Sequence, residues 1–180
     1  MDTIKLILPS EAYLDQVWAY RQEFVSAGLS MDGTSALHKI DAPEKLWREW
    51  LPEILLFADR STVPEAYAQT TQFLSIRESD SKLVGMIQVR HYFTDYLEKF
   101  GGHIGYSVRP SEQRKGYAKE QLRLMLPYCK ELGFDRVLIS CRNDNEGSRR
   151  TILANGGVYE STVHEPKEHR DLERYWIALS

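Results

Sequence analysis

The sequence has little of what marks a secreted, metal-binding or membrane protein. Its 180 residues include two cysteines, Cys129 and Cys141, without a Cys-x-x-Cys pair or a histidine-rich spacing, so neither a disulfide framework nor a metal site is indicated. No stretch approaches the ~18 apolar residues of a membrane span. Met1 to Pro9 also lacks the basic start and long apolar run of a secretion signal. We therefore expect a cytoplasmic protein with two buried thiols, no membrane partner and no metal.

A surplus of positive charge is missing too. The 26 acidic and 23 basic residues leave a net charge of -3, so we expect no nucleic-acid partner and look instead to small molecules or proteins. Neither Gly-x-Gly-x-x-Gly after a strand nor the Walker spacing Gly-x-x-x-x-Gly-Lys-Ser/Thr occurs, which removes the main support for a dinucleotide or P-loop protein. A chain of this length can bury roughly 70% of its unfolded surface in one core. We expect a single domain over residues 1–180.

The most informative stretch covers residues 103–126. Alternating apolar and polar residues over 104–108 predict a strand, which Pro110 ends. A charged turn follows, and apolar residues at helical spacing then predict a helix that begins near Gly116. The first-turn N–H groups of a helix and the positive end of its dipole attract a phosphate, and Arg114 and Lys115 add positive charge. An ordinary charged turn between a strand and a helix is the alternative.

The rest of the chain predicts an α/β (α+β) fold with a mixed sheet covered by helices on both sides. Ser10 is expected to cap the first helix, and Asp41 with Glu44 the second. Two β-rich runs, 71–79 and 83–92, predict a hairpin in which Gly85 marks a bulge or a close backbone neighbour. The remaining predicted strands are residues 4–8, 136–141, 158–163 and 174–179, with a loop over 164–171 joining the last two.

Three segments stand in a characteristic order and spacing. They are Leu83-Val84-Gly85-Met86-Ile87, then Ile104 to Ala118 with Gln113-x-x-Gly116-x-Ala118, then Val137 to Gly157 with Asn145-x-x-Ser148 and Asn155-Gly156-Gly157. Over roughly residues 71–163 this combination resembles the GNAT N-acetyltransferase superfamily, and more closely a bacterial branch of predicted acetyltransferases. The resemblance implies a GNAT-like, mostly antiparallel twisted sheet of about six or seven strands flanked by helices.

The resemblance also implies acetyl-CoA as the co-substrate and no metal. The N–H groups of Arg114 through Lys119 would hold the pyrophosphate, and the strand at 103–108 would pair with the pantetheine where it splays from the strand at 136–141. Asn145 would hydrogen-bond the pantetheine, cap the following helix, or do both. The implied cofactor-binding residues are Ser107, Val108, Gln113, Arg114, Lys115, Gly116, Tyr117, Ala118, Lys119, Asn145 and Ser148.

For catalysis, the resemblance places His103 where some members carry a glutamate base, and it places the backbone N–H that holds the carbonyl oxyanion near Val108. A hydrogen-bonded structural role for His103 is the alternative. Many members carry a tyrosine acid four residues before the glycine that ends the motif; here that position is Leu153. The acid is therefore unassigned, with Tyr106, Tyr159, Tyr175 and water as alternatives.

The implied activity is acyl-CoA-dependent N-acetylation of a primary amine by direct attack. The acceptor, a small molecule or a peptide, is unidentified. Trp47, Trp50 and the loops at 60–69 and 164–171 are expected to shape its pocket, with the two tryptophans alternatively in the core. Arg90 and His91 are candidates for binding an acidic part of the acceptor. Alternatives are a non-catalytic acyl-CoA-binding sensor and a nucleotide-binding protein; a homodimer is compatible with these features.

Overall fold

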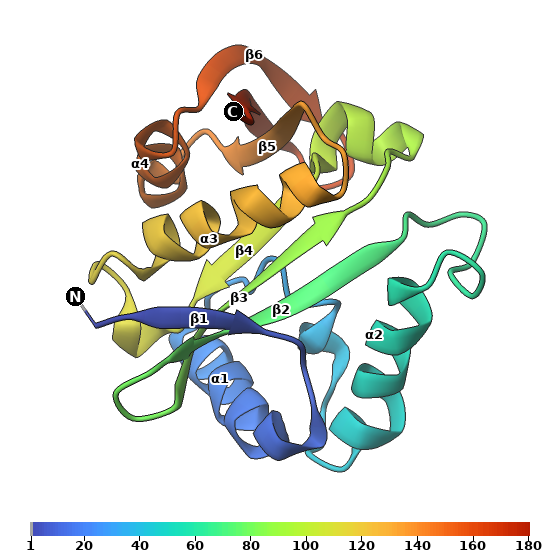
Figure 1. Ribbon diagram of the computed structural model, residues 1–180, viewed down its shortest axis with the longest axis vertical. Coiled ribbons are helices and arrows are strands. Elements are labelled where there is room, and N and C mark those ends of the chain that lie inside the picture. Colours follow the sequence, from blue (N-terminus) through green and yellow to red (C-terminus); the bar gives the residue numbers. More distant parts are fainter. Residues whose placement is uncertain (1) are drawn as a thin grey trace.

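The strands of the protein form two sheets rather than one (Figure 1). This computed structural model describes residues 2–180. Met1, which belongs to the segment 1–9 considered above for a secretion signal, lies outside the described residues. The first sheet has the order β1 (Ile4–Ile7), β2 (Thr70–Arg77), β3 (Lys82–Arg90) and β4 (Ile104–Val108). The second has the order β5 (Arg136–Arg142), β7 (Arg170–Ala178) and β6 (Val158–Glu165). Every ladder in these two sheets is antiparallel, and the seven strands of residues 2–180, flanked by helices, confirm the fold class that the resemblance implies.

Helices cover both faces of the first sheet, as predicted (Figure 1). The helices α1 (Leu14–Ala27) and α2 (Leu51–Ala58) pack on one face, while α3 (Tyr117–Glu131) crosses the other and contacts α4 (Glu146–Ala154). Two π-helical turns, Leu46–Trp50 and Leu97–Gly101, precede α2 and β4. Short 3-10 turns lie at Glu11–Tyr13, Leu37–Lys39 and Pro110–Glu112.

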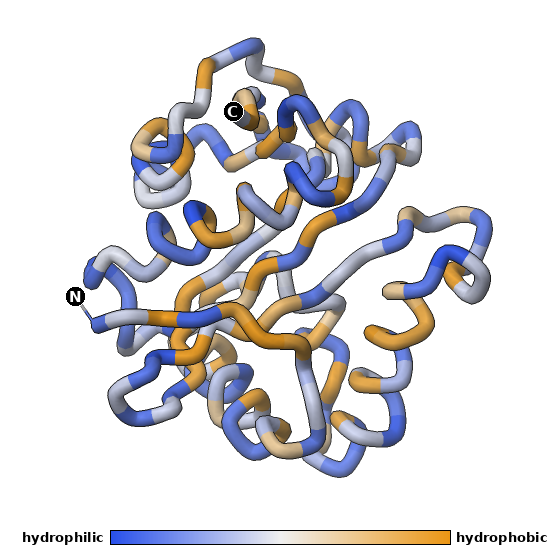
Figure 2. Tube along the Cα trace, viewed as in Figure 1, coloured by the Kyte–Doolittle hydropathy of each residue, from blue (hydrophilic) through white to orange (hydrophobic). Residues whose placement is uncertain are grey.

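Three apolar clusters among residues 2–180 hold these layers together, and two of them are large. One joins α1 and α2 to the first sheet through Tyr20, Phe24 and Trp50. The other lies between α3 and both sheets and includes Leu122 and Ile139. Figure 2 shows hydrophobic stretches of the tube along the strands in the middle of the molecule. The second cluster contains both free cysteines, which are buried as expected.

Gly85 combines both features predicted for it. The register between β2 and β3 shifts beside its partner, from Ser75–Gly85 to Ile76–Leu83, which is a β-bulge. A Cβ atom on Gly85 would lie 3.0 Å from the backbone oxygen of Ser107, which is the close backbone neighbour, and 2.5 Å from the Gln121 side-chain oxygen, so the missing side chain also lets α3 approach the sheet. This approach sets the start of α3 beside β4.

The two sheets meet at one point and then separate. An isolated bridge links Gly102 to Ile139, and the His103 N–H donates to the Leu138 carbonyl at 2.7 Å. Beyond this point β5 pairs with β7, and no ladder among residues 2–180 covers the edge of β4 that faces away from β3. The splayed strands implied by the resemblance are therefore present.

Several local predictions were wrong. The Ser10 side chain makes no capping hydrogen bond. The Asp41–Glu44 pair does not start a helix, because the Asp41 carboxylate pairs with Lys45 at 2.9 Å and the helical segment begins at Leu46. Strands β6 and β7 extend into the segment expected to be a loop, which leaves only residues 166–169 as a turn.

Candidate active site

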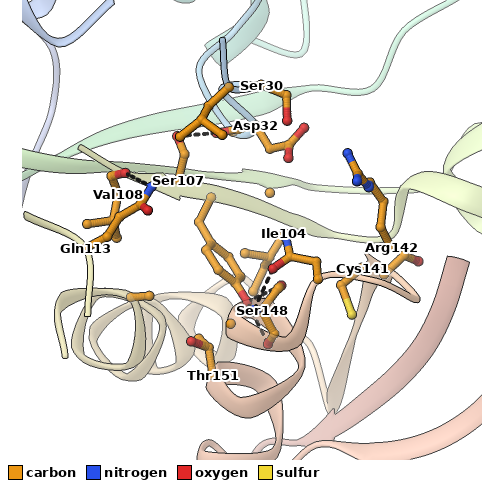
Figure 3. Close-up of a pocket in the computed structure, with 18 of the residues that line it drawn as sticks. Ser30, Asp32, Ile104, Ser107, Val108, Gln113, Cys141, Arg142, Ser148 and Thr151 are labelled. Atoms are coloured by element: carbon orange, nitrogen blue, oxygen red, sulfur yellow. Dashed lines mark hydrogen bonds between the residues drawn. The ribbon is translucent and has the colours of Figure 1, made fainter. Parts of the chain in front are cut away.

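A cavity of about 940 Å³ lies where β4 and β5 diverge, bounded by the start of α3, the start of α4 and residues 29–33 (Figure 3). Nearly all the predicted cofactor residues line it. They are Ser107, Val108, Gln113, Arg114, Gly116, Tyr117, Ala118, Lys119, Asn145 and Ser148. Lys115 does not line the cavity; its ammonium group pairs with Glu112 at 2.9 Å. A volume of this size accommodates a large, elongated ligand.

The start of α3 is open to this cavity. The N-cap residue Gly116 has a φ of 90°, a left-handed conformation that glycine adopts without strain, and no side chain caps the first turn. Arg114 is also left-handed, with a φ of 61°. The Gln113 amide donates to the Val108 carbonyl at 3.1 Å and so fixes this turn against β4. The N–H groups of the first turn are therefore left without a side-chain partner and are free to hydrogen-bond an anion.

The buried carboxylate of Glu112 stabilises the turn that precedes α3. Glu112 is 3% exposed and accepts hydrogen bonds from Arg77 at 2.9 Å, Lys82 at 2.6 Å and Lys115 at 2.9 Å. Burial by itself would raise the pKa of Glu112, but the hydrogen bonds from Lys82 and Lys115 outweigh it and lower the pKa to about 2.

This pKa predicts an acid-dependent stability. Because the folded pKa is depressed, ionised Glu112 stabilises the fold above its ordinary pKa, and this contribution is lost as the pH falls towards about 2. Glu112→Gln should therefore lower the free energy of unfolding by about 2–3 kcal/mol at pH 7, and the difference should shrink at pH 3. Urea unfolding at both pH values measures it. The exposed Glu131→Gln is the control, and a deficit independent of pH would contradict the prediction.

The edge of β4 presents backbone groups to the same cavity. Hydrogen bonds join Arg90 N–H to His103 O and Arg109 N–H to Val84 O, both at 2.8 Å, which sets the alternation of the β3–β4 ladder. In that alternation the amides of Tyr106 and Val108 point away from β3 and towards the diverging β5. An extended ligand in the gap can pair with them as an added strand does.

The start of α4 supplies polar side chains across the gap. Asn145 caps this helix, because its side-chain oxygen accepts from the Ser148 N–H at 3.0 Å, and it also lines the cavity. The Ser148 hydroxyl lies 2.8 Å from the Tyr106 hydroxyl (Figure 3). Of the tyrosines considered as acids, Tyr106 lines the cavity, whereas Tyr159 and Tyr175 do not.

His103 is not positioned to act as the base. It is 6% exposed, does not line the cavity, and its ring packs against Phe93 and Phe134. Its Nδ1 accepts the Leu138 N–H at 2.9 Å, so the proton of the neutral ring is on Nε2. The neutral ring therefore has no lone pair left to accept a proton from a substrate. Burial, assisted by the charge of Arg90, lowers the pKa of His103 to about 4. His103 instead holds β5 at the point where the strands separate.

His103→Ala should accordingly lower stability. Losing a buried ring and leaving the Leu138 N–H without its acceptor should cost about 2–4 kcal/mol in the free energy of unfolding. His103→Asn, whose side-chain oxygen can replace Nδ1, should recover part of this loss and keep turnover near that of the wild type. Chemical denaturation and steady-state rates measure the two effects. A base role would instead make both variants equally slow.

The residues expected around the acceptor lie elsewhere. Trp50 is fully buried in the core, and Trp47, 53% exposed, stacks with Arg48 outside the cavity. His91 contacts Thr71, and the segment 60–69 does not line the cavity either. Besides the predicted cofactor residues, the cavity is lined by Asp32, Arg90, Tyr96, Phe100, Arg142 and Arg170, and we name these six residues the acceptor end. Of these, only Arg90 and Arg170, within the segment 164–171, were indicated by the sequence.

Asp32 is distinctive among the carboxylates of the cavity. Glu112 is held by three cations, and Asp144 pairs with Arg142 at 2.6 Å, whereas Asp32 has no ion pair within residues 2–180. Its backbone carbonyl accepts the Ser107 hydroxyl at 2.6 Å, which fixes residue 32 over β4 (Figure 3). The Asp32 carboxylate is thus an available proton acceptor.

An open helix start at a cavity between two diverging strands is an arrangement suited to binding an anionic ligand. The model of the acetyltransferase (GNAT) domain matches residues 32–158, and the chain belongs to this family. Within residues 2–180 no cluster of three or more metal-ligating side chains occurs, and no helix there is long and apolar enough to cross a bilayer.

Known proteins similar to this chain agree with the family. An uncharacterized N-acetyltransferase of Bacillus subtilis, YnaD, is 27% identical over 113 residues, which are 60% of this chain and 63% of the relative. The ribosomal-protein-S5-alanine acetyltransferase of Vibrio fischeri has a similar structure, with a TM-score of 0.76, 16% identity and coverage of 100% and 95% of the two chains. The structure of RimL, a ribosomal L7/L12 α-N-protein acetyltransferase in complex with coenzyme A, has a TM-score of 0.75 at 17% identity, with coverage of 98% of this chain and 94% of RimL.

Proposed function

We propose that this protein transfers an acetyl group from acetyl-CoA to a primary amine by direct attack. The observation that carries the proposal is the uncapped start of α3 and the unpaired edge of β4 within one cavity. Family membership supports the activity, and the coenzyme A complex of RimL supports the carrier. In this proposal the amides of residues 114–119 hold the pyrophosphate, and β4 with Asn145 holds the pantetheine.

The chain's residues then have distinct tasks. Asp32 takes a proton from the acceptor ammonium, directly or through a water, because only the neutral amine is a nucleophile. The Val108 N–H donates to the carbonyl oxygen as the new N–C bond forms. When the C–S bond breaks, the nitrogen loses its second proton to water, and the Ser148 hydroxyl, hydrogen-bonded to Tyr106, relays a proton from water to the sulfur, so that the serine ends neutral. No cysteine is needed as a nucleophile, and burial raises the pKa of the Cys141 thiol to about 11, which keeps it protonated.

The activity test measures thiol release from acetyl-CoA with a broad panel of amines. Turnover that depends on an amine supports the enzyme. Tight coenzyme A binding without turnover above hydrolysis would favour the alternative, an acyl-CoA sensor. Thermal stabilisation by ATP but not by coenzyme A would favour a nucleotide-binding protein.

We further propose that residues 1–180 act as one domain in the cytoplasm on a small-molecule or peptide amine. Acetyl-CoA as donor and two free cysteines support the compartment. Fractionation and assays with longer acyl donors test the location and the donor.

A further inference from the structure

The acceptor end of the cavity contains an arginine that forms no ion pair with another described residue. Arg90, the last residue of β3, lines this end and takes part in no ion pair within residues 2–180. Its Nη1 donates to the Gly101 carbonyl at 3.3 Å, and among the described residues this is the one hydrogen bond of the Arg90 guanidinium. A half-buried guanidinium with five donors and one weak acceptor has capacity left for a ligand.

The position of this guanidinium is set by a glycine. A Cβ atom on Gly105 of β4 would lie 3.3 Å from Arg90 Nη2 and 3.4 Å from Nη1, so the absence of a side chain leaves room for the group over the strand. Burial lowers the pKa of Arg90 to about 10, with the charge of Asp32 opposing that change. Arg90 is therefore still charged at neutral pH, and a nearby anion would stabilise that charge.

A second arginine at the same end has an unused donor. The Nε atom of Arg170 is buried and lacks a hydrogen-bond partner among the described residues, although its Nη2 pairs with Glu168 at 2.9 Å. A buried donor without an acceptor costs free energy that a ligand oxygen can recover. Arg142, in contrast, is occupied by Asp144 through two hydrogen bonds, of 2.9 and 2.6 Å.

We propose that the acceptor carries an anionic group, a carboxylate or a phosphate, close to its amine, and that Arg90, helped by Arg170, binds that group. This rests on the proposed acetyltransfer function. Arginine recognises both anions through paired N–H donors, while Asp32 provides the negative charge for the ammonium group. Purely cationic acceptors are disfavoured because their charges would lie beside two arginines.

The first test compares matched acceptors with the wild-type protein. The pairs are serine with serinamide and phosphoethanolamine with ethanolamine, and spermidine is the cationic probe. In at least one pair the anionic member should have a kcat/KM at least about tenfold higher than that of its neutral partner. A preference for serine would indicate a carboxylate, and a preference for phosphoethanolamine would indicate a phosphate. Turnover that favours the neutral or cationic members would overturn this inference and leave acetyl transfer intact. Failure of every amine would remove the proposed function itself.

Variants test the residue. Arg90→Gln should raise KM for the anionic acceptor at least about tenfold and should lower the preference for the anionic over the neutral analogue by a similar factor. Arg90→Lys should retain part of the preference. The control is Arg123→Gln, because Arg123 lies outside the cavity and pairs with Glu120. An equal loss for anionic and neutral acceptors would show a structural role and overturn the assignment.

Discussion

Ala118→Asp should weaken coenzyme A binding by at least about 100-fold without unfolding the protein. Ala118 lies in the first turn of α3 and lines the cavity. A carboxylate there would occupy the anion site and repel the pyrophosphate; two unit charges 4 Å apart repel by about 4 kcal/mol at an effective dielectric constant of 20. An acidic residue in a first turn also favours the helix, so folding should be preserved. Calorimetric titration with coenzyme A and thermal melting separate the two effects.

Ala118→Asn is the matched control for this result. It has nearly the same size as aspartate and no charge, so it should lose far less affinity. If both variants bound equally weakly, bulk rather than charge would be responsible. If Ala118→Asp bound coenzyme A as the wild type does, the diphosphate site would not be at the start of α3.

Asp32→Asn should lower kcat by about 100-fold and leave the affinity for acetyl-CoA nearly unchanged. The substitution keeps the shape of the side chain but removes the proton acceptor. The deficit should shrink at high pH, because the neutral fraction of the free amine rises tenfold with each pH unit below its pKa. Steady-state rates across a pH series measure both the loss and its recovery.

The control is Asp15→Asn, since Asp15 is exposed on α1 and does not line the cavity. It should match the wild type at every pH. A loss in Asp32→Asn that persists unchanged at high pH, or that appears mainly in the KM for acetyl-CoA, would contradict the base role of Asp32.

Local signals in the sequence were enough to predict the turn and the helix starts that line one side of the cavity. Gly116 between a strand and a helix, Gln113 before it and Asn145 at a helix start each depend on conformations and hydrogen bonds within a few residues. The hairpin with its bulge at Gly85 is equally local. These elements therefore appear where the residue pattern predicted them.

Only the tertiary structure decided the acceptor half. Asp32 reaches the cavity because a loop crosses β4 and bonds to Ser107, 75 positions away in the chain. His103 points instead into the core, because the Leu138 N–H of β5 bonds to its ring. Trp50 was buried by packing with α1 and the first sheet. The sequence by itself determined the β2–β3 hairpin, the turn before α3 and the start of α4, because these depend on neighbouring residues. Contacts between distant segments decided which side chains share the cavity, because burial and strand pairing depend on the whole chain.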